Sequence, residues 1–201
     1  KMFLNPGGKG NNQANAAHKL GGDVLFIAKV GYDPFGDAAI AYLQENGLKT
    51  EGIIRDENHR TGTAVIMVDE TSRENQITVA PGANHHISRK NIKTLRSVIK
   101  SNDICLFQLE TNLEAILYTM QIAKQAENLV ILNLAPTPDK IPTNLLNNVD
   151  ILIMNEIEAE SLSSLKVFHK KSALEAAKYM AKQNHLIAII TLGELGTVAH
   201  D

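Results

Sequence analysis

Apolar runs alternate with helix-like segments over residues 88–191, and this alternation limits the fold more than any other feature. Strands are expected at 103–108, 129–134, 150–154 and 186–191, and helices at 88–99, 113–126, 156–162 and 172–183. Strands that alternate with helices pair in parallel and are covered by those helices. The sequence therefore predicts an α/β fold, a mostly parallel sheet with helices on both faces.

The alternation of apolar runs and helix-like segments is interrupted between residues 50 and 80. Short β-like runs at 52–55, 63–68 and 75–80 are separated by polar turns, with no room for crossover helices. We expect these runs to form a small antiparallel sheet that acts as a flap. The predicted organisation is a first part of the α/β core at 1–49, a β-flap lid at 50–80, and a second part of the core at 81–201. The first part contains a helix at 11–20, a strand at 24–30 and a helix at 37–45.

Residues 7–17 combine glycines, amides and small residues at the start of the first expected helix. Glycines let a ligand approach the main chain, and Lys9 and Asn12 offer hydrogen-bond donors. The segment lacks the Ser or Thr that follows Gly-Lys in a P-loop. It also has Gln13 where a dinucleotide-binding loop has its third glycine. It is therefore either a loop that binds a small polar ligand or a helix entry rich in small residues.

Polar residues lie at or just after the end of each expected strand of the second core part. The residues concerned are Gln108 and Glu110, Asn133, Asn155 with Glu156 and Glu158, and Thr191 with Gly193 and Gly196. Each has a structural alternative, since Asn155 can cap a helix and Glu158 can lie in its first turn. The carboxyl ends of parallel strands share one edge of a sheet, so polar groups at four such ends indicate a ligand site.

Composition excludes several classes of function. A net charge of −2 argues against a nucleic-acid partner, and the apolar runs are too short to span a bilayer. The single cysteine, Cys105, lies within an apolar run, so a buried structural thiol is expected rather than a disulfide or a nucleophile. No signal peptide opens the sequence. These features predict a cytoplasmic protein without a membrane partner.

Six segments in register resemble the ribokinase family of carbohydrate kinases. They are Gly7–Ala14, Pro81–Asn84, Gln108–Glu110, Asn133–Pro136, Asn155–Glu160 and Thr191–Gly196. The resemblance implies transfer of the ATP γ-phosphate to a sugar hydroxyl, with the sugar held between the parallel-sheet part and the flap. The expected substrate is a pentose, D-ribose, and the product ribose 5-phosphate. The expected partners are therefore a small-molecule sugar and ATP.

The resemblance also implies roles for individual residues. Sugar binding is assigned to Gly8, Lys9, Gly10, Asn12 and Glu110. Nucleotide binding is assigned to Asn155, Thr191, Gly193, Glu194 and Gly196, and Glu158 is assigned to the metal. The implied cofactors are ATP and Mg²⁺, with a monovalent cation such as K⁺ as a further candidate. Family members often pair their flaps between subunits, so a homodimer is expected.

Two departures from the family pattern bear on activity. The family's catalytic aspartate lies in a Gly-Ala-Gly-Asp motif, which does not occur in these 201 residues, so the base is expected beyond Asp201. The family's N-terminal strand is missing too, and we expect the sequence to be truncated at both ends. Residues 1–201 alone are expected to be inactive.

The sequence is also compatible with two alternative functions. One is a sugar-binding module or pseudoenzyme that lacks the catalytic end. The other is a related kinase for deoxyribose, a hexose or a nucleoside. The aromatic content of 4%, with no tryptophan, disfavours a nucleoside site that stacks on a base.

Overall fold

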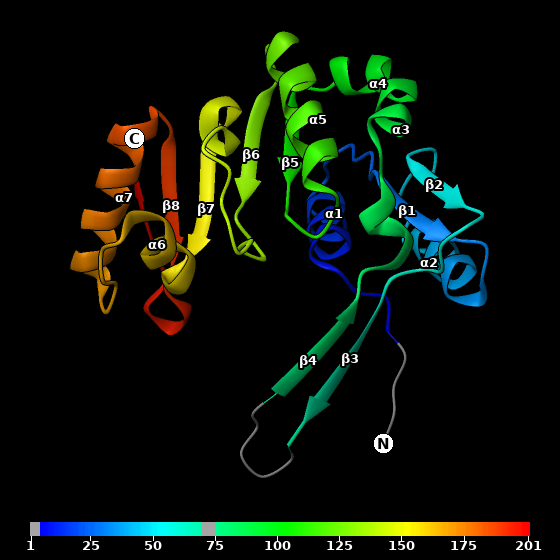
Figure 1. The fold of residues 1–201 in the computed structure, drawn as a ribbon, viewed down its shortest axis with the longest axis horizontal. Helices are drawn as coiled ribbons and strands as arrows, with labels where there is room; N and C mark the ends of the chain where they lie inside the picture. The colour runs from blue at the N-terminus through cyan, green and yellow to red at the C-terminus, as the bar shows by residue number, and fades with distance from the viewer. Residues whose placement is uncertain (1–4, 70–74) are drawn as a thin grey trace. The chain divides into compact units, whose positions relative to one another are not determined.

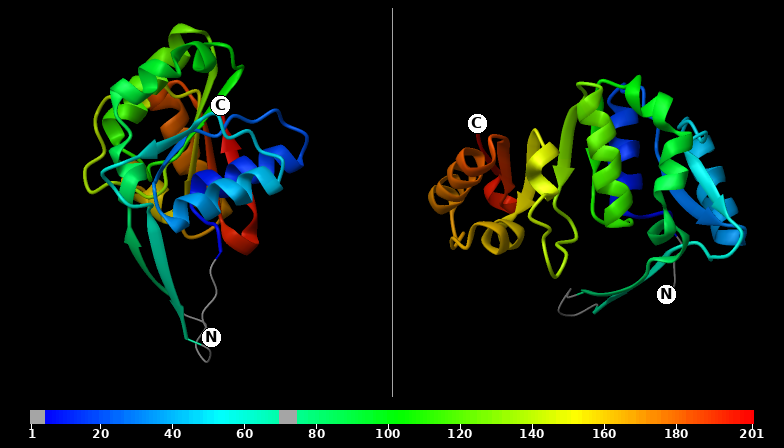
Figure 2. Two further views of the ribbon diagram at one scale, coloured as in Figure 1. Left: turned by 90° about the vertical axis from the view of Figure 1, so that its right-hand side faces the viewer. Right: turned by 45° about the horizontal axis from the view of Figure 1, so that its top comes forward.

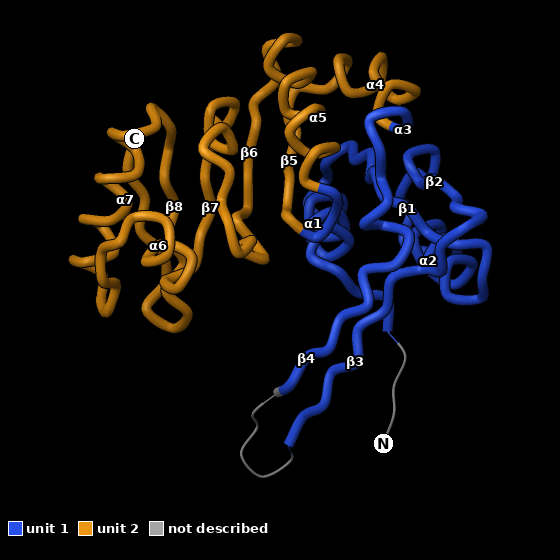
Figure 3. The backbone as a smooth tube through the Cα atoms, in the orientation of Figure 1, with its two compact units in different colours: residues 1–91, 110–112 blue, residues 92–109, 113–201 orange. Residues whose placement is uncertain are grey.

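The structure is a computed structural model that describes residues 5–69 and 75–201 (Figure 1). The chain divides into two compact units (Figure 3). Unit 1 consists of Lys1–Asn91 and Glu110–Asn112, and unit 2 consists of Ile92–Leu109 and Leu113–Asp201. The short segment Glu110–Asn112 thus packs with the N-terminal half of the chain, although it follows a strand of unit 2.

The described residues of unit 1 form two α-helices, one 3₁₀ helix and two small sheets. Its elements are α1 (Lys9–Lys19), β1 (Ala28–Gly31), α2 (Pro34–Glu45), β2 (Ile53–Asp56), β3 (Thr63–Val68), β4 (Asn75–Ala80) and the 3₁₀ helix η1 (Gly82–His86). Helix α2 has a proline in its first turn, and the side chain of Asp33 caps it by accepting from the N–H of Gly36 at 2.9 Å. Ala14 of α1, Leu43 of α2 and Leu48 form a buried cluster in this unit.

The two small sheets differ from the predicted arrangement in one respect. The run at 52–55 was expected in the antiparallel sheet, but this is wrong, because β2 pairs in parallel with β1. Helix α2 lies between these strands in sequence and supplies the crossover that a parallel pair needs. Strands β3 and β4 do pair antiparallel, with Ile66 opposite Ile77, and form a two-stranded ribbon (Figures 1 and 2).

Unit 2 is built on a five-stranded sheet in the order β5-β6-β7-β8-β9. Its strands are β5 (Ile104–Phe107), β6 (Leu129–Asn133), β7 (Ile151–Asn155), β8 (Ile187–Thr191) and β9 (Thr197–His200). Its helices are α4 (Arg96–Lys100), α5 (Leu113–Gln125), α6 (Glu156–Ser163) and α7 (Lys170–Asn184), with 3₁₀ turns at Leu145–Asn148 (η2) and Gly193–Leu195 (η3). Strands β5 to β8 are parallel and β9 is antiparallel to β8. The predicted mostly parallel α/β architecture with a small antiparallel sheet is confirmed.

Alternate residues of the unit 2 strands form its core. Leu132 of β6, Leu152 of β7 and Ile190 of β8 are fully buried on one face, and α5, α6 and α7 pack against the sheet. On the opposite face, Ile104 and Ile187 remain partly exposed among the described residues. Strands with Val, Ile and Leu at nearly every position are typical of parallel sheets.

Two elements differ from the sequence-based prediction: a helix at the border of the two units and a strand in unit 2. The single helix predicted at 88–99 is divided at Leu95 into α3 (Arg89–Thr94) and α4. Ser88 caps α3, since its Oγ accepts from the N–H of Asn91 at 3.3 Å. Strand β9 was not predicted, because its four residues are too few to show a clear alternation.

No helix in the described part of the chain is both long and apolar enough to cross a membrane.

Candidate functional site

The glycine loop of unit 1 joins a carboxylate from a distant part of the chain. Helix α1 begins at Lys9, and none of the side chains next to it in sequence caps it. Instead, the N–H of Lys9 donates to Oε2 of Glu110 at 2.7 Å. Gly8, at φ 95°, turns the backbone into the helix in a conformation that favours glycine. A carboxylate at a helix N-terminus is favoured by the helix dipole, so Glu110 serves as the cap of α1.

This arrangement leaves polar groups at the loop that can bind a ligand. Within the described residues, the ammonium of Lys9 and the amide of Asn12 have no protein partner, and both residues are exposed. Of the atoms in the described part of the chain, a Cβ built on Gly7 would meet none within 4 Å, and one on Gly8 would meet only Oε2 of Glu110. An open backbone with donors and a carboxylate acceptor is suited to a polyhydroxyl ligand, because each hydroxyl both donates and accepts.

In unit 2, Asn155 and Glu158 form a capping box at the start of α6. The N–H of Glu158 donates to Oδ1 of Asn155, and the N–H of Asn155 donates to Oε2 of Glu158, both at 2.8 Å. The structural alternative for these two residues is therefore present in the fold. It does not exclude a ligand role, because Oε1 of Glu158 has no protein partner among the described residues.

The turn between β8 and β9 lies next to this capping box. Thr191, the last residue of β8, is in register with Asn155 of β7. Gly193 and Gly196 follow at φ 52° and φ 88°, and no atom of the residues that the structure describes lies within 4 Å of a Cβ built on either. Exposed Glu194 lies between them. Backbone N–H groups in such a glycine turn are accessible to phosphate oxygens.

The implied cofactors fit these residues to different degrees. Oε1 of Glu158 is a hard oxygen ligand of the kind that Mg²⁺ takes, directly or through water. The glycine turn offers open backbone to a nucleotide. No group of three or more His, Cys, Asp or Glu side chains that could hold a metal ion by themselves occurs in residues 5–69 and 75–201. A magnesium site here would thus use Glu158 together with water and phosphate oxygens.

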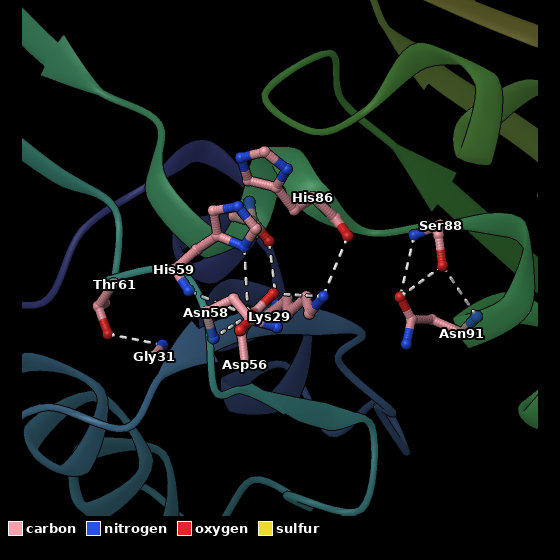
Figure 4. A network of polar contacts seen from close by, with 10 residues as sticks. Lys29, Gly31, Asp56, Asn58, His59, Thr61, His86, Ser88 and Asn91 are labelled. Carbon is pink, nitrogen blue, oxygen red and sulfur yellow. Dashed lines mark hydrogen bonds and ion pairs between the residues drawn. The ribbon is translucent and has the colours of Figure 1, made fainter.

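A polar network that sequence reasoning missed surrounds the base of the β3–β4 ribbon (Figure 4). The ammonium of Lys29 contacts Oδ2 of Asp56 at 2.5 Å and donates to the carbonyl of His86 at 3.1 Å. Asp56 also accepts from the backbone N–H groups of Asn58 and His59. The hydrogen bond from Lys29 holds the pKa of the Asp56 carboxyl far below its usual value, although burial works in the opposite direction. The rings of His59 and His86, which flank the ribbon in sequence, stack with centroids 3.5 Å apart.

Two sets of contacts anchor the base of the ribbon. The first is the network around Lys29 and Asp56, and the second is formed by Asp33. Its Oδ2 accepts from the N–H of Thr61 at 2.8 Å, and the N–H of Gly31 donates to Oγ1 of Thr61 at 2.9 Å. Burial works to raise the pKa of Asp33, but hydrogen bonds from Thr61 and Gly36 outweigh it, and the net shift is downward. The two anchors tie the ends of the ribbon to β1 and β2 within unit 1.

The single cysteine, Cys105, lies in an environment that disfavours its reactive form. Cys105 is partly buried beside Nδ2 of Asn128, and burial raises the pKa of its thiol. This environment favours the thiol over the reactive thiolate.

In α1, Asn11 and Asn15 form a side-chain pair that sequence reasoning also missed. Their spacing of four residues, one helical turn, is the signal that could have revealed it.

Comparison with known proteins gives consistent matches over the whole chain. A profile of pfkB family carbohydrate kinases matches residues 2–201. Ribokinase of Haemophilus influenzae is 38% identical over 190 residues, which are 94% of this chain and 61% of that protein. Deoxyribokinase of Salmonella typhi is 32% identical over 192 residues, which are 96% of this chain and 62% of that protein.

A solved structure agrees with these matches. The structure of Arabidopsis thaliana ribokinase complexed with ribose and ATP has a TM-score of 0.81 and 27% sequence identity to this chain. The match covers 96% of this chain and 62% of the other. The chain spans about three-fifths of the length of the curated relatives it matches. Since the family profile matches from residue 2 to residue 201, the chain belongs to the pfkB family of carbohydrate kinases.

Proposed function

We propose that the protein transfers the γ-phosphate of ATP to a hydroxyl of a pentose, with D-ribose as substrate and ribose 5-phosphate as product. The observation that carries the sugar part of this proposal is the contact between Lys9 and Glu110. It places a carboxylate acceptor beside a glycine loop whose Lys9 and Asn12 side chains are available as donors. The similarity to ribokinases over nearly the whole chain supports the choice of ribose.

In this proposal, the residues of unit 1 bind and orient the sugar. Glu110 accepts a hydrogen bond from a sugar hydroxyl through Oε1, while its Oε2 stays on the N–H of Lys9. Lys9, Asn12, Gly10 and the open backbone at Gly8 surround the remaining hydroxyls. Fixed partners of this kind raise the rate by holding the reacting hydroxyl in one orientation.

The residues of unit 2 hold the nucleotide. Backbone N–H groups around Gly193 and Gly196 bind phosphate oxygens, with Thr191 and Glu194 beside them, and Asn155 holds Glu158 in position through the capping box. Mg²⁺, when bound through Glu158, supplies neutralisation of phosphate charge. In the overall reaction, the bond between the γ-phosphorus and its bridging oxygen breaks and a bond to the sugar oxygen forms. The hydroxyl proton passes to a base that we assign to none of these residues.

A second sugar is supported by a specific similarity. Deoxyribokinases share about one-third of their residues with this chain over the same span. 2-Deoxyribose is therefore the competing substrate within the same class of reaction. The experiment that tests both measures ADP release by the full-length protein with D-ribose, 2-deoxyribose, a hexose or a nucleoside as acceptor. A higher kcat/KM for D-ribose is expected, and release with none of them would support a binding module.

Assembly, location and cation dependence complete the proposal. Ile66, Val68, Ile77 and Val79 lie on one face of the β3–β4 ribbon, and each is more than half exposed. An apolar strand pair of this kind is a favourable surface for a second copy, so we propose a homodimer formed through the ribbon. We further propose a cytoplasmic location and dependence on Mg²⁺, with K⁺ as a candidate activator.

A further inference from the structure

Two asparagines one helical turn apart in α1 are joined by their side chains. Nδ2 of Asn15 donates to the backbone carbonyl of Asn11 at 2.8 Å and to Oδ1 of Asn11 at 2.9 Å. Asn15 is 8% exposed and Asn11 is partly buried. The pair lies in the first two turns of the helix, directly after the glycine loop.

These contacts determine which way each amide is turned. A backbone carbonyl oxygen only accepts hydrogen bonds, so the Asn15 atom beside the carbonyl of Asn11 has to be the nitrogen. That nitrogen also faces the side chain of Asn11, where a second NH₂ group would give an unfavourable donor-donor contact. The Asn11 atom at this point is therefore its oxygen. Consequently, Nδ2 of Asn11, with two N–H donors, faces away from Asn15.

The arrangement lowers the stability of the folded chain. Oδ1 of Asn15 is buried and has no hydrogen-bond partner among residues 5–69 and 75–201. A buried acceptor without a partner is destabilising, and an aliphatic side chain of similar size would avoid this cost. The stability of α1 therefore does not explain an asparagine at this position. A role in holding the Asn11 amide does.

Asn11 lies in the first turn of α1, directly after the glycines of the proposed sugar loop. Asn11 lies one residue from Asn12 and two from Lys9, and its Nδ2 has no protein acceptor within residues 5–69 and 75–201. A fixed N–H donor at a sugar site discriminates strongly between a sugar with the matching hydroxyl and an analogue without it, because the donor is left unpaired in the second case.

We propose that Nδ2 of Asn11 donates a hydrogen bond to one hydroxyl oxygen of the sugar, and that Asn15 is the positioning residue that fixes this donor. The inference rests on the proposed function and adds a determinant of substrate choice to it. Asn11 selects acceptors that carry this hydroxyl over deoxy analogues that lack it.

The test is calorimetric titration of the full-length protein with D-ribose and with each of its monodeoxy analogues. Asn11→Ala should weaken ribose binding about tenfold. The same substitution should leave unchanged the affinity for the one analogue that lacks the bonded hydroxyl. Asn11→Asp, which still accepts from Asn15 but has no donor, should lose at least as much ribose affinity as Asn11→Ala.

Asn15→Leu tests the positioning role. It should weaken ribose binding severalfold while ATP affinity is unchanged and the melting temperature does not fall, because the unpaired oxygen is removed. Asn184→Ala is the control, since Nδ2 of Asn184 makes the same kind of bond to the carbonyl of Met180 in α7. This control should leave ribose affinity unchanged.

The possible results distinguish a failure of this inference from a failure of the proposed function. Wild-type protein that binds ribose, with an Asn11→Ala variant that binds it equally well, would overturn this inference and leave the proposed function standing. An equal loss for ribose and for every analogue would also overturn it, because the role would then be structural. If wild-type protein binds no pentose, the proposed function fails and this inference fails with it.

Discussion

The N–H of Lys9 and Oε2 of Glu110 lie 2.7 Å apart, although 101 positions separate the two residues in sequence. The contact satisfies one of the N–H groups that α1 would otherwise leave unpaired and puts a negative charge at the positive end of the helix. Glu110 is therefore held at the glycine loop by the fold, and its Oε1 has no hydrogen-bond partner among the described residues.

Removal of this carboxylate should weaken sugar binding selectively. In the full-length protein, Glu110→Ala and Asn12→Ala should each reduce the free energy of ribose binding by about 1–3 kcal/mol, because a sugar hydroxyl loses its partner. ATP affinity should be unchanged, and exposed Glu51→Ala serves as the control. Calorimetric titration measures both ligands. Unchanged ribose affinity in both variants would contradict the sugar assignment.

The capping box allows the structural and the ligand roles of Glu158 to be separated. Glu158→Gln keeps an oxygen that accepts from the N–H of Asn155, so the melting temperature should change little. It removes the negative charge that a magnesium site needs, and MgATP binding should weaken about tenfold or more. Asn155→Ala, by contrast, should cost about 1 kcal/mol of stability through loss of the cap. If Glu158→Gln binds MgATP as tightly as wild type, the metal assignment is wrong.

Asp56 should contribute to stability in a pH-dependent manner. Its pKa is lower in the folded chain than the ordinary carboxyl value of about 4, chiefly because of Lys29. A lowered folded pKa favours the native state at all pH values above about 4. That contribution declines as the pH falls further toward the folded pKa.

Urea denaturation between pH 6 and pH 2.5 tests this coupling. Asp56→Asn should be less stable than wild type by about 1–3 kcal/mol at pH 6. Its stability should also fall less steeply below pH 4, by at most about 1.4 kcal/mol per pH unit for a single group. Asp23→Asn, which breaks an exposed ion pair with Lys49, should have little effect at either pH. Equal slopes for wild type and Asp56→Asn would show that Asp56 is not the coupled group.

The apolar face of the ribbon should be needed for dimer formation. Ile66 and Ile77 lie opposite each other on this face, so Ile66→Lys should place a charge in the proposed interface and produce monomers. Thr78→Lys, on the opposite face of the same ribbon, is the matched control and should remain dimeric. Sedimentation of the full-length proteins measures both. A wild-type protein that is monomeric at high concentration would rule out this mode of assembly.

Regular alternation made the unit 2 core predictable, and short elements were less so. Runs such as 129–134 and 150–154 are apolar at nearly every position, and short runs of this kind are typical of buried parallel strands. The run at 52–55 was assigned to the wrong sheet, because a strand's partner depends on the preceding crossover as well as on its own residues. β9 is too short to carry a periodic signal.

The contacts of the candidate site were also predictable from the sequence only in part. The capping box of Asn155 and Glu158 follows from local spacing, so sequence reasoning foresaw it as a structural alternative. The pairing of Lys29 with Asp56 joins two strands through the fold, and no local pattern predicts it. The Lys9–Glu110 contact was likewise inaccessible from spacing, and only the family resemblance placed both residues at one site. The ligand roles of all these residues stay predictions.

The proposed pentose kinase activity can be measured on the full-length protein by incubation with D-ribose, ATP and Mg²⁺, followed by phosphorus NMR of the products. We expect ADP and ribose 5-phosphate in equal amounts, no product without ribose, and a strongly reduced rate for Glu110→Ala at subsaturating ribose. Ribose binding without any phosphorylated sugar would rule out the kinase activity and identify the protein as a sugar-binding module.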